Sequence, residues 1–200
     1  WTVPYLPIDP KDVGRTYDSD VIRINSQSGR GGVSYVLKNS FGLILPDKMK
    51  EEVGYLMKNV SDHRHAELSP EDMRDVFKET YVDVDKKFDV SECHFKQKDG
   101  IGAEITIVAD GKKTVVDSHG NGRLNAVNHA IKKYFNLDYA LDVYEEHSLS
   151  KRSDAQAISY VGIKPAGQEK LYWGAGTDDD IIKSSIDALV NAVNRYMENK

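Results

Sequence analysis

The 200-residue sequence has little cysteine, little proline and no long apolar run, and each shortage excludes a class of protein. Its single cysteine, Cys93, rules out an internal disulfide framework and fits a reducing, cytoplasmic compartment. No segment approaches the roughly 20 consecutive apolar residues that a membrane-spanning helix needs, so we expect no membrane partner. With only six prolines, a collagen-like or proline-rich chain is also excluded.

Basic and acidic residues are nearly equal in number, and the basic residues are scattered along the chain. The chain has 27 basic and 32 acidic residues and a net charge of -5, and its basic pairs Lys112-Lys113 and Lys132-Lys133 are short. A nucleic-acid partner would need a basic stripe, so none is expected. A 40% hydrophobic content supports a folded core. The start, Trp1 to Pro4, has neither an initiator Met nor a signal-peptide pattern, which we interpret as a cut inside a longer polypeptide.

The first part, residues 1–84, is predicted to be a small and mostly helical unit. Prolines favour an extended stretch over 1–20, followed by a short strand over 21–25. A short helix over 33–37 then ends at Gly42. Two longer helices begin at Pro46 and, with Ser69 as N-cap, at Pro70, and the polar segment 61–65 between them is predicted to be a loop. Apolar residues repeat on one face of each longer helix: Met49, Val53, Leu56, Met57 and Val60, then Met73, Val76, Phe77 and Tyr81.

The second part, residues 85–200, is predicted to be an internal duplication. The apolar period changes to two near Asp85, and hairpin turns at Asp99-Gly100 and Asp110-Gly111 separate three strands that a helix follows. The same order of three strands and a helix returns after residue 138. A single three-stranded unit cannot bury its sheet face, so the two units should pack together. The predicted class is α+β, a helical subdomain followed by a duplicated βββα domain.

A Gly-x-Gly string is predicted to join the third strand to the helix in each copy, as Gly120-Asn121-Gly122 and Gly174-Ala175-Gly176. Glycines let a ligand approach the backbone, and free N–H groups at a helix start favour an anion. A carboxylate on the first string, with Leu124, Tyr144 and Ile181 around an aliphatic side chain, describes a site for a small amino acid. The alternative is that the glycines only make the turn.

Other motifs carry less chemistry. The Ser26 to Gly32 segment lacks the lysine and the spacing of a phosphate loop and is interpreted as a turn. His63 and His65 are spaced like metal ligands but are expected in a solvated loop. His119 has two open interpretations, contact with a bound carboxylate or a capping role. Asp178-Asp179-Asp180 is interpreted as negative charge at the start of the last helix. No nucleophile–base–acid set stands out, which favours a binding module.

Two long strings near the start resemble a known family. WTVPYLPIDPKDVGR over 1–15 and RINSQSGRGG over 23–32 resemble the region that follows the catalytic barrel of the 2-isopropylmalate synthase family. Gly120 to Gly122, Asp154 to Ala157 and Trp173 to Gly176 resemble the leucine-sensing domain of that family. The resemblance covers essentially the whole chain.

The resemblance implies a function for the whole protein. The family condenses acetyl-CoA with 2-oxoisovalerate to 2-isopropylmalate and CoA, an acyltransferase step of leucine synthesis. Its barrel, with a divalent metal, would lie upstream of Trp1, so this chain is expected to hold no cofactor and to be inactive alone. Residues 1–84 would be linker subdomains, and residues 85–200 would form a homodimer and bind L-leucine as feedback inhibitor.

The resemblance also implies an effector site. Small alanines would leave room for the isobutyl group of leucine, and backbone amides would take its carboxylate. Tyr5 matches a family tyrosine implicated in the active site or in its coupling to leucine, with a packing aromatic as the alternative. The effector-binding positions that the resemblance implies are Asn121, Gly122, Leu124, Asn125, Tyr144, Ser148, Ala155, Ala157 and Ile181.

Some positions depart from the family pattern. Arg123 stands where proline is common, Asn125 and Ser148 stand where alanine is common, and the loop around Asn136 is one residue longer. Added polar groups in an apolar pocket can shift preference among leucine, isoleucine and valine. Leucine is the expected effector. The alternatives are a citramalate-type domain that senses isoleucine, a dimerisation domain without effector, and a complete small enzyme.

Overall fold

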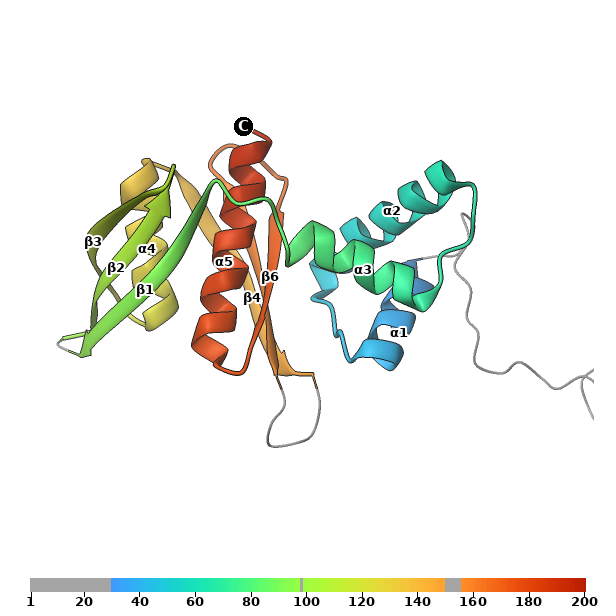
Figure 1. The fold of residues 1–200 in the computed structure, drawn as a ribbon, viewed down its shortest axis with the longest axis horizontal. Helices are drawn as coiled ribbons and strands as arrows, with labels where there is room; N and C mark the ends of the chain where they lie inside the picture. The colour runs from blue at the N-terminus through green and yellow to red at the C-terminus, as the bar shows by residue number, and fades with distance from the viewer. Residues whose placement is uncertain (1–29, 98, 150–155) are drawn as a thin grey trace, which may run out of the picture.

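The elements of the computed structural model, which describes residues 30–97, 99–149 and 156–200, form three groups in space (Figure 1). A three-helix unit lies at one end, the first βββα unit lies at the other, and the second βββα unit lies between them. The predicted α+β class and the duplicated order are confirmed. The elements are α1 (Arg30–Phe41), α2 (Asp47–Arg64), α3 (Pro70–Tyr81), β1 (Phe88–Gln97), β2 (Ile101–Ala109), β3 (Lys112–Gly120), α4 (Arg123–Phe135), β4 (Tyr139–Ser148), β5 (Ala157–Pro165), β6 (Tyr172–Asp178) and α5 (Ile181–Glu198).

The end of α1 and the start of α3 follow their predicted signals, but α1 begins at Arg30, so Gly31 and Gly32, which were predicted in a turn, lie inside the helix. Gly42 ends α1 with φ of +71°, and α3 begins with a capping box in which the Asp72 amide donates to Ser69 Oγ at 3.1 Å. The Ser69 amide donates in return to the Asp72 carboxylate at 3.0 Å. The predicted strand over 21–25 and the stretch over 1–20 lie outside the described residues.

The loop predicted over 61–65 is wrong, because α2 continues to Arg64. Ser61 is buried and its hydroxyl donates to the carbonyl of Ala66 at 2.8 Å, which lets a polar residue continue the buried stripe of Val53 and Met57. The helix ends only where His65 adopts the left-handed conformation, with φ of 49°. A polar run was mistaken for a loop because its inward serine has a local backbone partner.

The two sheets are antiparallel meanders in the orders β1-β2-β3 and β4-β5-β6. Asp99, Gly100, Asp110 and Gly111 all have positive φ, as the predicted hairpin turns require. The first strand of each unit carries a register shift at the same place, between Val90 and Glu92 in β1 and between Leu141 and Val143 in β4. This shared irregularity supports the duplication beyond the order of the elements.

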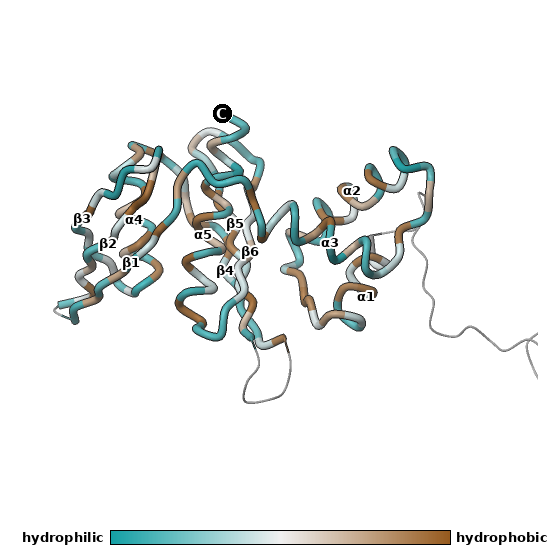
Figure 2. The backbone as a smooth tube through the Cα atoms, viewed as in Figure 1, coloured by the Kyte–Doolittle hydropathy of each residue, from teal (hydrophilic) through white to brown (hydrophobic). Residues whose placement is uncertain are grey.

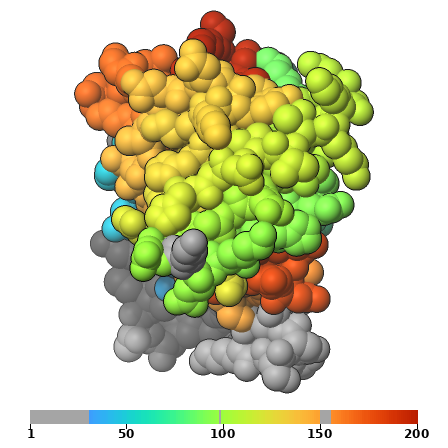
Figure 3. Space-filling model, turned by 90° about the vertical axis from the view of Figure 1, so that its left-hand side faces the viewer, coloured from blue at the N-terminus to red at the C-terminus, as the bar shows by residue number. Residues whose placement is uncertain are grey.

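The two units share one core, as predicted. Helix α4 packs on β2 and β3, and α5 packs on β5 and β6 while also contacting α4 and β1. Helix α5 therefore lies at the seam between the units (Figure 1). Seen from the end opposite the helical unit, the strands and helix of the first unit cover most of the face without a break (Figure 3). The core that joins the units, called the inter-unit core here, includes Ile105, Ile107, Ala126, Ile131, Val161, Ile163, Leu189 and Val193.

The second Gly-x-Gly string does not join a strand to a helix. Gly174 and Gly176 lie inside β6, and the chain enters α5 only after Asp178. A Cβ on Gly174 would lie 2.2 Å from the carbonyl oxygen of Ala188, and one on Gly176 would lie 2.2 Å from that of Ser184. These glycines let α5 lie directly on the sheet. Their spacing in the sequence does not distinguish this packing role from a turn.

The other face of the second sheet carries the helical unit. Strand β5 is buried on both faces, since Val161 and Ile163 face α5 while Ile158 and Tyr160 face α1–α3. Apolar residues accordingly recur along β5, β6 and α5 (Figure 2). None of the described helices is long and apolar enough to cross a bilayer. The core between helices and sheet, called the linker core here, includes Leu37, Met49, Met73, Phe77, Ile158, Tyr160, Trp173 and Ala175.

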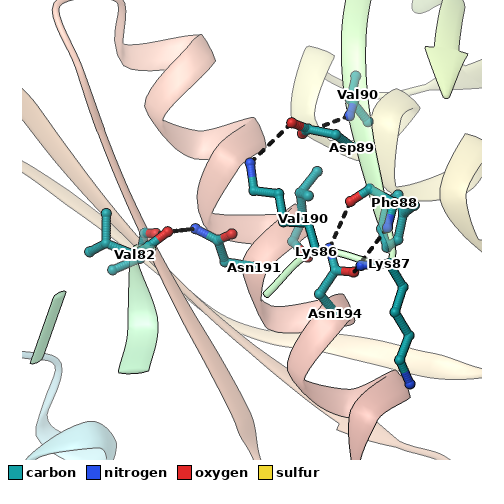
Figure 4. A network of polar contacts seen from close by, with 10 residues as sticks. Val82, Lys86, Lys87, Phe88, Asp89, Val90, Val190, Asn191 and Asn194 are labelled. Carbon is teal, nitrogen blue, oxygen red and sulfur yellow. Dashed lines mark hydrogen bonds and ion pairs between the residues drawn. The ribbon is translucent and has the colours of Figure 1, made fainter. Parts of the chain in front are cut away.

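The segment between the helical unit and β1 is held by two asparagines of α5 (Figure 4). The Asn191 amide nitrogen donates to the carbonyl of Val82 at 2.7 Å. Asn194 Oδ1 accepts from the backbone amides of Lys87 at 2.7 Å and Phe88 at 3.2 Å, and its Nδ2 donates to the Phe88 carbonyl at 2.9 Å. Helix α5 therefore fixes where the linker enters the sheet domain. The division at residues 84 and 85 stays a prediction.

Candidate effector-binding site

The start of α4 presents unpaired backbone donors. Its N-cap is Gly122, which has no side chain to cap the helix, and the first intrahelical bond is donated by the amide of Ala126 to the Gly122 carbonyl at 2.9 Å. The N–H groups of Arg123, Leu124 and Asn125 have no helical partner, and no hydrogen bond to another described residue satisfies them. Such amides favour a carboxylate or another anion.

The neighbouring side chains shape this helix start. The Asn125 side chain reaches back and accepts from the Asn121 amide at 3.2 Å, so Asn125 orders the turn. Leu124 is half-buried against the inter-unit core. The guanidinium of Arg123 lies 5.7 Å from the centre of the Phe95 ring, which holds a positive charge near the free amides.

A second group of predicted residues lies on the α5 side of β4 and β5. Tyr144, Glu146 and Ser148 pair with Val161, Ser159 and Ala157, so the six side chains share the sheet face that α5 covers. Tyr144 is 39% exposed and Ile181, in the first turn of α5, is 42% exposed. The exposed Tyr144 and Ile181 therefore form an open apolar surface beside the polar Glu146, Ser148 and Ser159.

The Tyr144 hydroxyl is tied into the start of α5. It donates its proton to the Glu146 carboxylate, and its oxygen lies 2.8 Å from Ser185 Oγ. Burial, followed by the hydrogen bond to Glu146, raises the pKa of Tyr144 above its ordinary value. Ser185 Oγ donates in turn to the Ile181 carbonyl at 2.6 Å. The tyrosine thus keeps its proton and links β4 to the helix.

Three serines that the sequence reasoning missed lie behind this tyrosine. Ser159, Ser184 and Ser185 are fully buried, and Ser159 Oγ lies 2.7 Å from Ser184 Oγ and 3.1 Å from Ser185 Oγ. The signal was present in the sequence, since two adjacent serines interrupt the apolar face of α5 between Ile182 and Ile186. Buried hydroxyls of this kind are retained only where they are paired.

The start of α5 is closed, in contrast to that of α4. The Asp180 carboxylate accepts from the amides of Ile182 at 2.7 Å and Lys183 at 3.4 Å, so this member of the Asp178-Asp179-Asp180 run, which was predicted to place negative charge at the helix start, is also the N-cap. Asp178 pairs with Lys183 at 2.6 Å, and the hydrogen bond from that lysine lowers the pKa of Asp178. An incoming carboxylate would meet two acids here.

The structure thus divides the predicted site into two groups at one end of the molecule. Asn121, Gly122, Leu124 and Asn125 gather at the start of α4, and Tyr144, Ser148, Ala157 and Ile181 gather near the start of α5. Both helices begin at the lower end in Figure 1. Ala155 and Tyr5 lie outside the described residues.

Two family models match different parts of the chain. The model of the LeuA allosteric (dimerisation) domain matches residues 67–197, and that of the alpha-isopropylmalate synthase post-catalytic domain-like region matches residues 1–38. The chain belongs to the LeuA allosteric domain family. The first of these matches contains both βββα units and α3.

Three curated relatives that match nearly all of this chain are named 2-isopropylmalate synthase. A 2-isopropylmalate synthase of Helicobacter hepaticus is 45% identical over 98% of this chain and 37% of its own length. One from Desulfitobacterium hafniense is 42% identical over all of this chain and 36% of its own length, and one from Corynebacterium efficiens is 38% identical over all of this chain and 34% of its own length. The chain therefore spans just over a third of the length of these relatives.

Two histidines that the sequence also raised as candidates have local contacts, and the cysteine is partly shielded by burial. His119 Nε2 lies 3.1 Å from the Asp99 carbonyl and packs on the β1–β2 turn, away from the α4 amides. His63 lies in the last turn of α2, with Nδ1 2.7 Å from the Asn59 carbonyl. Burial raises the pKa of Cys93 to about 11, so its thiol stays protonated. Within the described ranges, no group of three or more His, Cys, Asp or Glu residues is placed to hold a metal ion.

Proposed function

We propose that this LeuA domain binds a branched-chain amino acid, with L-leucine as the first candidate, and lowers the activity of the synthase that carries it. The observation that supports this most is the uncapped start of α4 beside the half-buried Leu124. Free amides suit the carboxylate of an amino acid, and an apolar surface suits its aliphatic side chain.

The Tyr144 group supplies the other half of the proposed recognition. Ile181 and the half-buried Ala157 offer apolar contact without filling space, and the Glu146 carboxylate beside Tyr144 offers an acceptor for an ammonium. In the proposed homodimer the effector would be enclosed between the α4 group and the Tyr144 group. The family description, an allosteric and dimerisation domain, supports this arrangement.

The whole protein is proposed to be a 2-isopropylmalate synthase. It would join acetyl-CoA to 2-oxoisovalerate and release CoA, with a divalent metal held by residues upstream of this chain. The names of the relatives support this proposal. The residues described here would contribute regulation and dimerisation. We therefore expect the isolated chain to release no CoA from these substrates.

Titration calorimetry with L-leucine, L-isoleucine and L-valine tests the proposed effector. Leucine should bind most tightly, and Tyr144→Phe should weaken it about threefold to tenfold by removing one hydroxyl from the buried network. Lys58→Gln on the exposed face of α2 is the matched control and should change nothing. Preferential binding of isoleucine would favour a citramalate-type sensor. This is the second candidate because Ser148 and Asn125 are polar where the family commonly has alanine.

The absence of heat with all three amino acids would contradict the effector proposal. A concentration-dependent dimer that no amino acid stabilises would then leave a purely structural dimerisation domain. The role of Tyr5 near the active site stays a prediction, which a Tyr5→Phe variant of the whole synthase would test through its leucine inhibition curve.

A further inference from the structure

A second cavity lies on the opposite face of the sheet from the proposed effector site. It has a volume of about 230 Å³ and lies between α1, α3 and the strands β5 and β6, where the helical unit meets the sheet domain. We call it the seam pocket. Its apolar walls include Leu43, Phe77 and Ile158, and its polar lining includes Arg74, Lys78 and Thr177.

The register of the strands separates the seam pocket from the proposed effector site. Ile158 pairs with Thr177 and both line the pocket on the helical side. The next pair, Ser159 and Gly176, faces α5 instead. The sheet itself therefore stands between the two sites, and a ligand in one does not touch the lining of the other.

Two cations mark one wall of the seam pocket. Arg74 and Lys78 are four residues apart on α3 and so lie on the same face of the helix as neighbours. Arg74 is oriented by Phe41, whose ring centre lies 5.2 Å from the guanidinium, and by an ion pair with Asp75 at 2.8 Å. That ion pair leaves guanidinium N–H groups available, because a guanidinium has five donors.

The size and the lining together select a class of ligand. The volume is below the roughly 300–1,000 Å³ of pockets for drug-sized molecules, so only a small molecule fits. The partly buried apolar residues of the lining, Phe41, Val82 and Leu149, favour an aliphatic body. Arg74 and Lys78 require a negative group at one end, and bidentate binding of a carboxylate suits an arginine best.

We propose that the seam pocket binds a short branched aliphatic carboxylate, at a site separate from the amino-acid site. The aliphatic part lies against Phe41, Val82 and Leu149, the partly buried apolar residues of the lining, and the carboxylate lies at Arg74 and Lys78. Such a ligand contacts α3 and the second sheet at once. Its binding therefore stabilises the docking of the helical unit on the sheet domain.

Isovalerate, a five-carbon branched acid without an ammonium, is the probe. Titration calorimetry of the 200-residue chain should show saturable binding, and the double variant Arg74→Gln, Lys78→Gln should weaken it at least about tenfold. Isoamyl alcohol, which has the same branched body but no charge, should bind at least about tenfold more weakly than isovalerate. Circular dichroism melting confirms that each variant is folded.

Two control variants separate this proposal from the effector proposal. Lys58→Gln removes a cation from α2 outside the pocket lining, and Tyr144→Phe alters the other face of the sheet, so neither should change isovalerate binding. Isovalerate binding that Tyr144→Phe weakens and the double variant leaves unchanged would overturn the seam pocket and leave the effector site in place. No saturable binding, or equal binding of isovalerate and the alcohol, would also overturn it.

Discussion

The two βββα units have the same architecture and opposite helix starts. Helix α4 begins at Gly122 with free amides, whereas α5 begins at Asp180, whose carboxylate occupies the equivalent donors. Both first strands carry the same register shift, so the backbones correspond closely. The duplicated fold therefore does not dictate an anion site, and one residue at each N-cap decides whether the helix start is open or closed.

The two helices carry the same asparagine string at different positions, near the start of α4 and in the second half of α5. The strings Asn125 to Asn128 and Asn191 to Asn194 are identical in sequence. Asn191 and Asn194 hold the linker before β1, although Asn191 Oδ1, like Asn128 Oδ1, is buried with no partner among the described residues. In the second unit these asparagines therefore hold the segment that connects the helical unit to β1.

The largest expected loss of stability comes from filling the space at Gly174, which is packed against α5, whereas Gly122 has open space around it. In Gly174→Val the new side chain would begin 2.2 Å from the Ala188 carbonyl oxygen, where backbone atoms leave no room. We expect a loss of about 3 kcal/mol or more in the free energy of unfolding, measured in urea. Gly122→Ala is the control with nothing within 4 Å of the added Cβ, and it should lose less than about 1 kcal/mol. Equal losses would contradict this packing role.

Capping the start of α4 with a carboxylate should make it resemble the capped start of α5 and should block effector binding. The φ of Gly122 is -152°, which any residue adopts, so Gly122→Asp can cap α4 as Asp180 caps α5. The new carboxylate takes the free amides and repels the effector, and we expect leucine affinity to fall about a hundredfold, or about 2.7 kcal/mol. Calorimetry measures this, with Gly122→Ala as the uncharged control. Unchanged affinity in Gly122→Asp would show that the carboxylate binds elsewhere.

The asparagine pair gives a third test. Asn194→Ala leaves the amides of Lys87 and Phe88 without their partner, so the free energy of unfolding should fall by about 2 kcal/mol. Asn128→Leu replaces a buried amide that has no partner for its oxygen, so stability should stay level or rise. Chemical unfolding of both variants checks the contrast. A larger loss in Asn128→Leu than in Asn194→Ala would reverse it.

The smallest expected effect is at the closed helix start. Asp180→Ala removes the acceptor of the Ile182 and Lys183 amides and should cost about 1 kcal/mol in the free energy of unfolding. Leucine affinity should not change, because Asp180 belongs to neither proposed group. A loss of affinity comparable to that in Gly122→Asp would mean that the α5 start takes part in effector binding.

Much of the fold was predictable from local patterns. The capping box at Ser69, the positive-φ turns at Asp99 and Asp110 and the duplicated strand order all depend on neighbours within a few residues. The end of α2 was missed because Ser61 is buried by contacts that its own segment does not reveal. The role of Gly174 was missed for a related reason, since only the approach of α5 shows that its glycine is needed for packing.

The candidate site was predictable in part. The glycines before α4 indicated an anion site with Tyr144 and Ile181 beside it, and resemblance to the family added Ser148 and Ala157. The buried serines at 159, 184 and 185 were not found, because they come from β5 and α5 and meet only in the tertiary structure. The cap at Asp180 was anticipated from its charge, but its consequence, a closed second helix start, needed the hydrogen bonds of both copies.

Backbone amide chemical shifts test the central claim most directly. When L-leucine is titrated into the ¹⁵N-labelled chain, the account predicts the largest shifts at the amides of Arg123, Leu124 and Asn125, with little change at Ile182 and Lys183. Shifts at the α5 amides without shifts at the α4 amides, or no shifts at saturating leucine, would contradict the claim that the open start of α4 receives the effector.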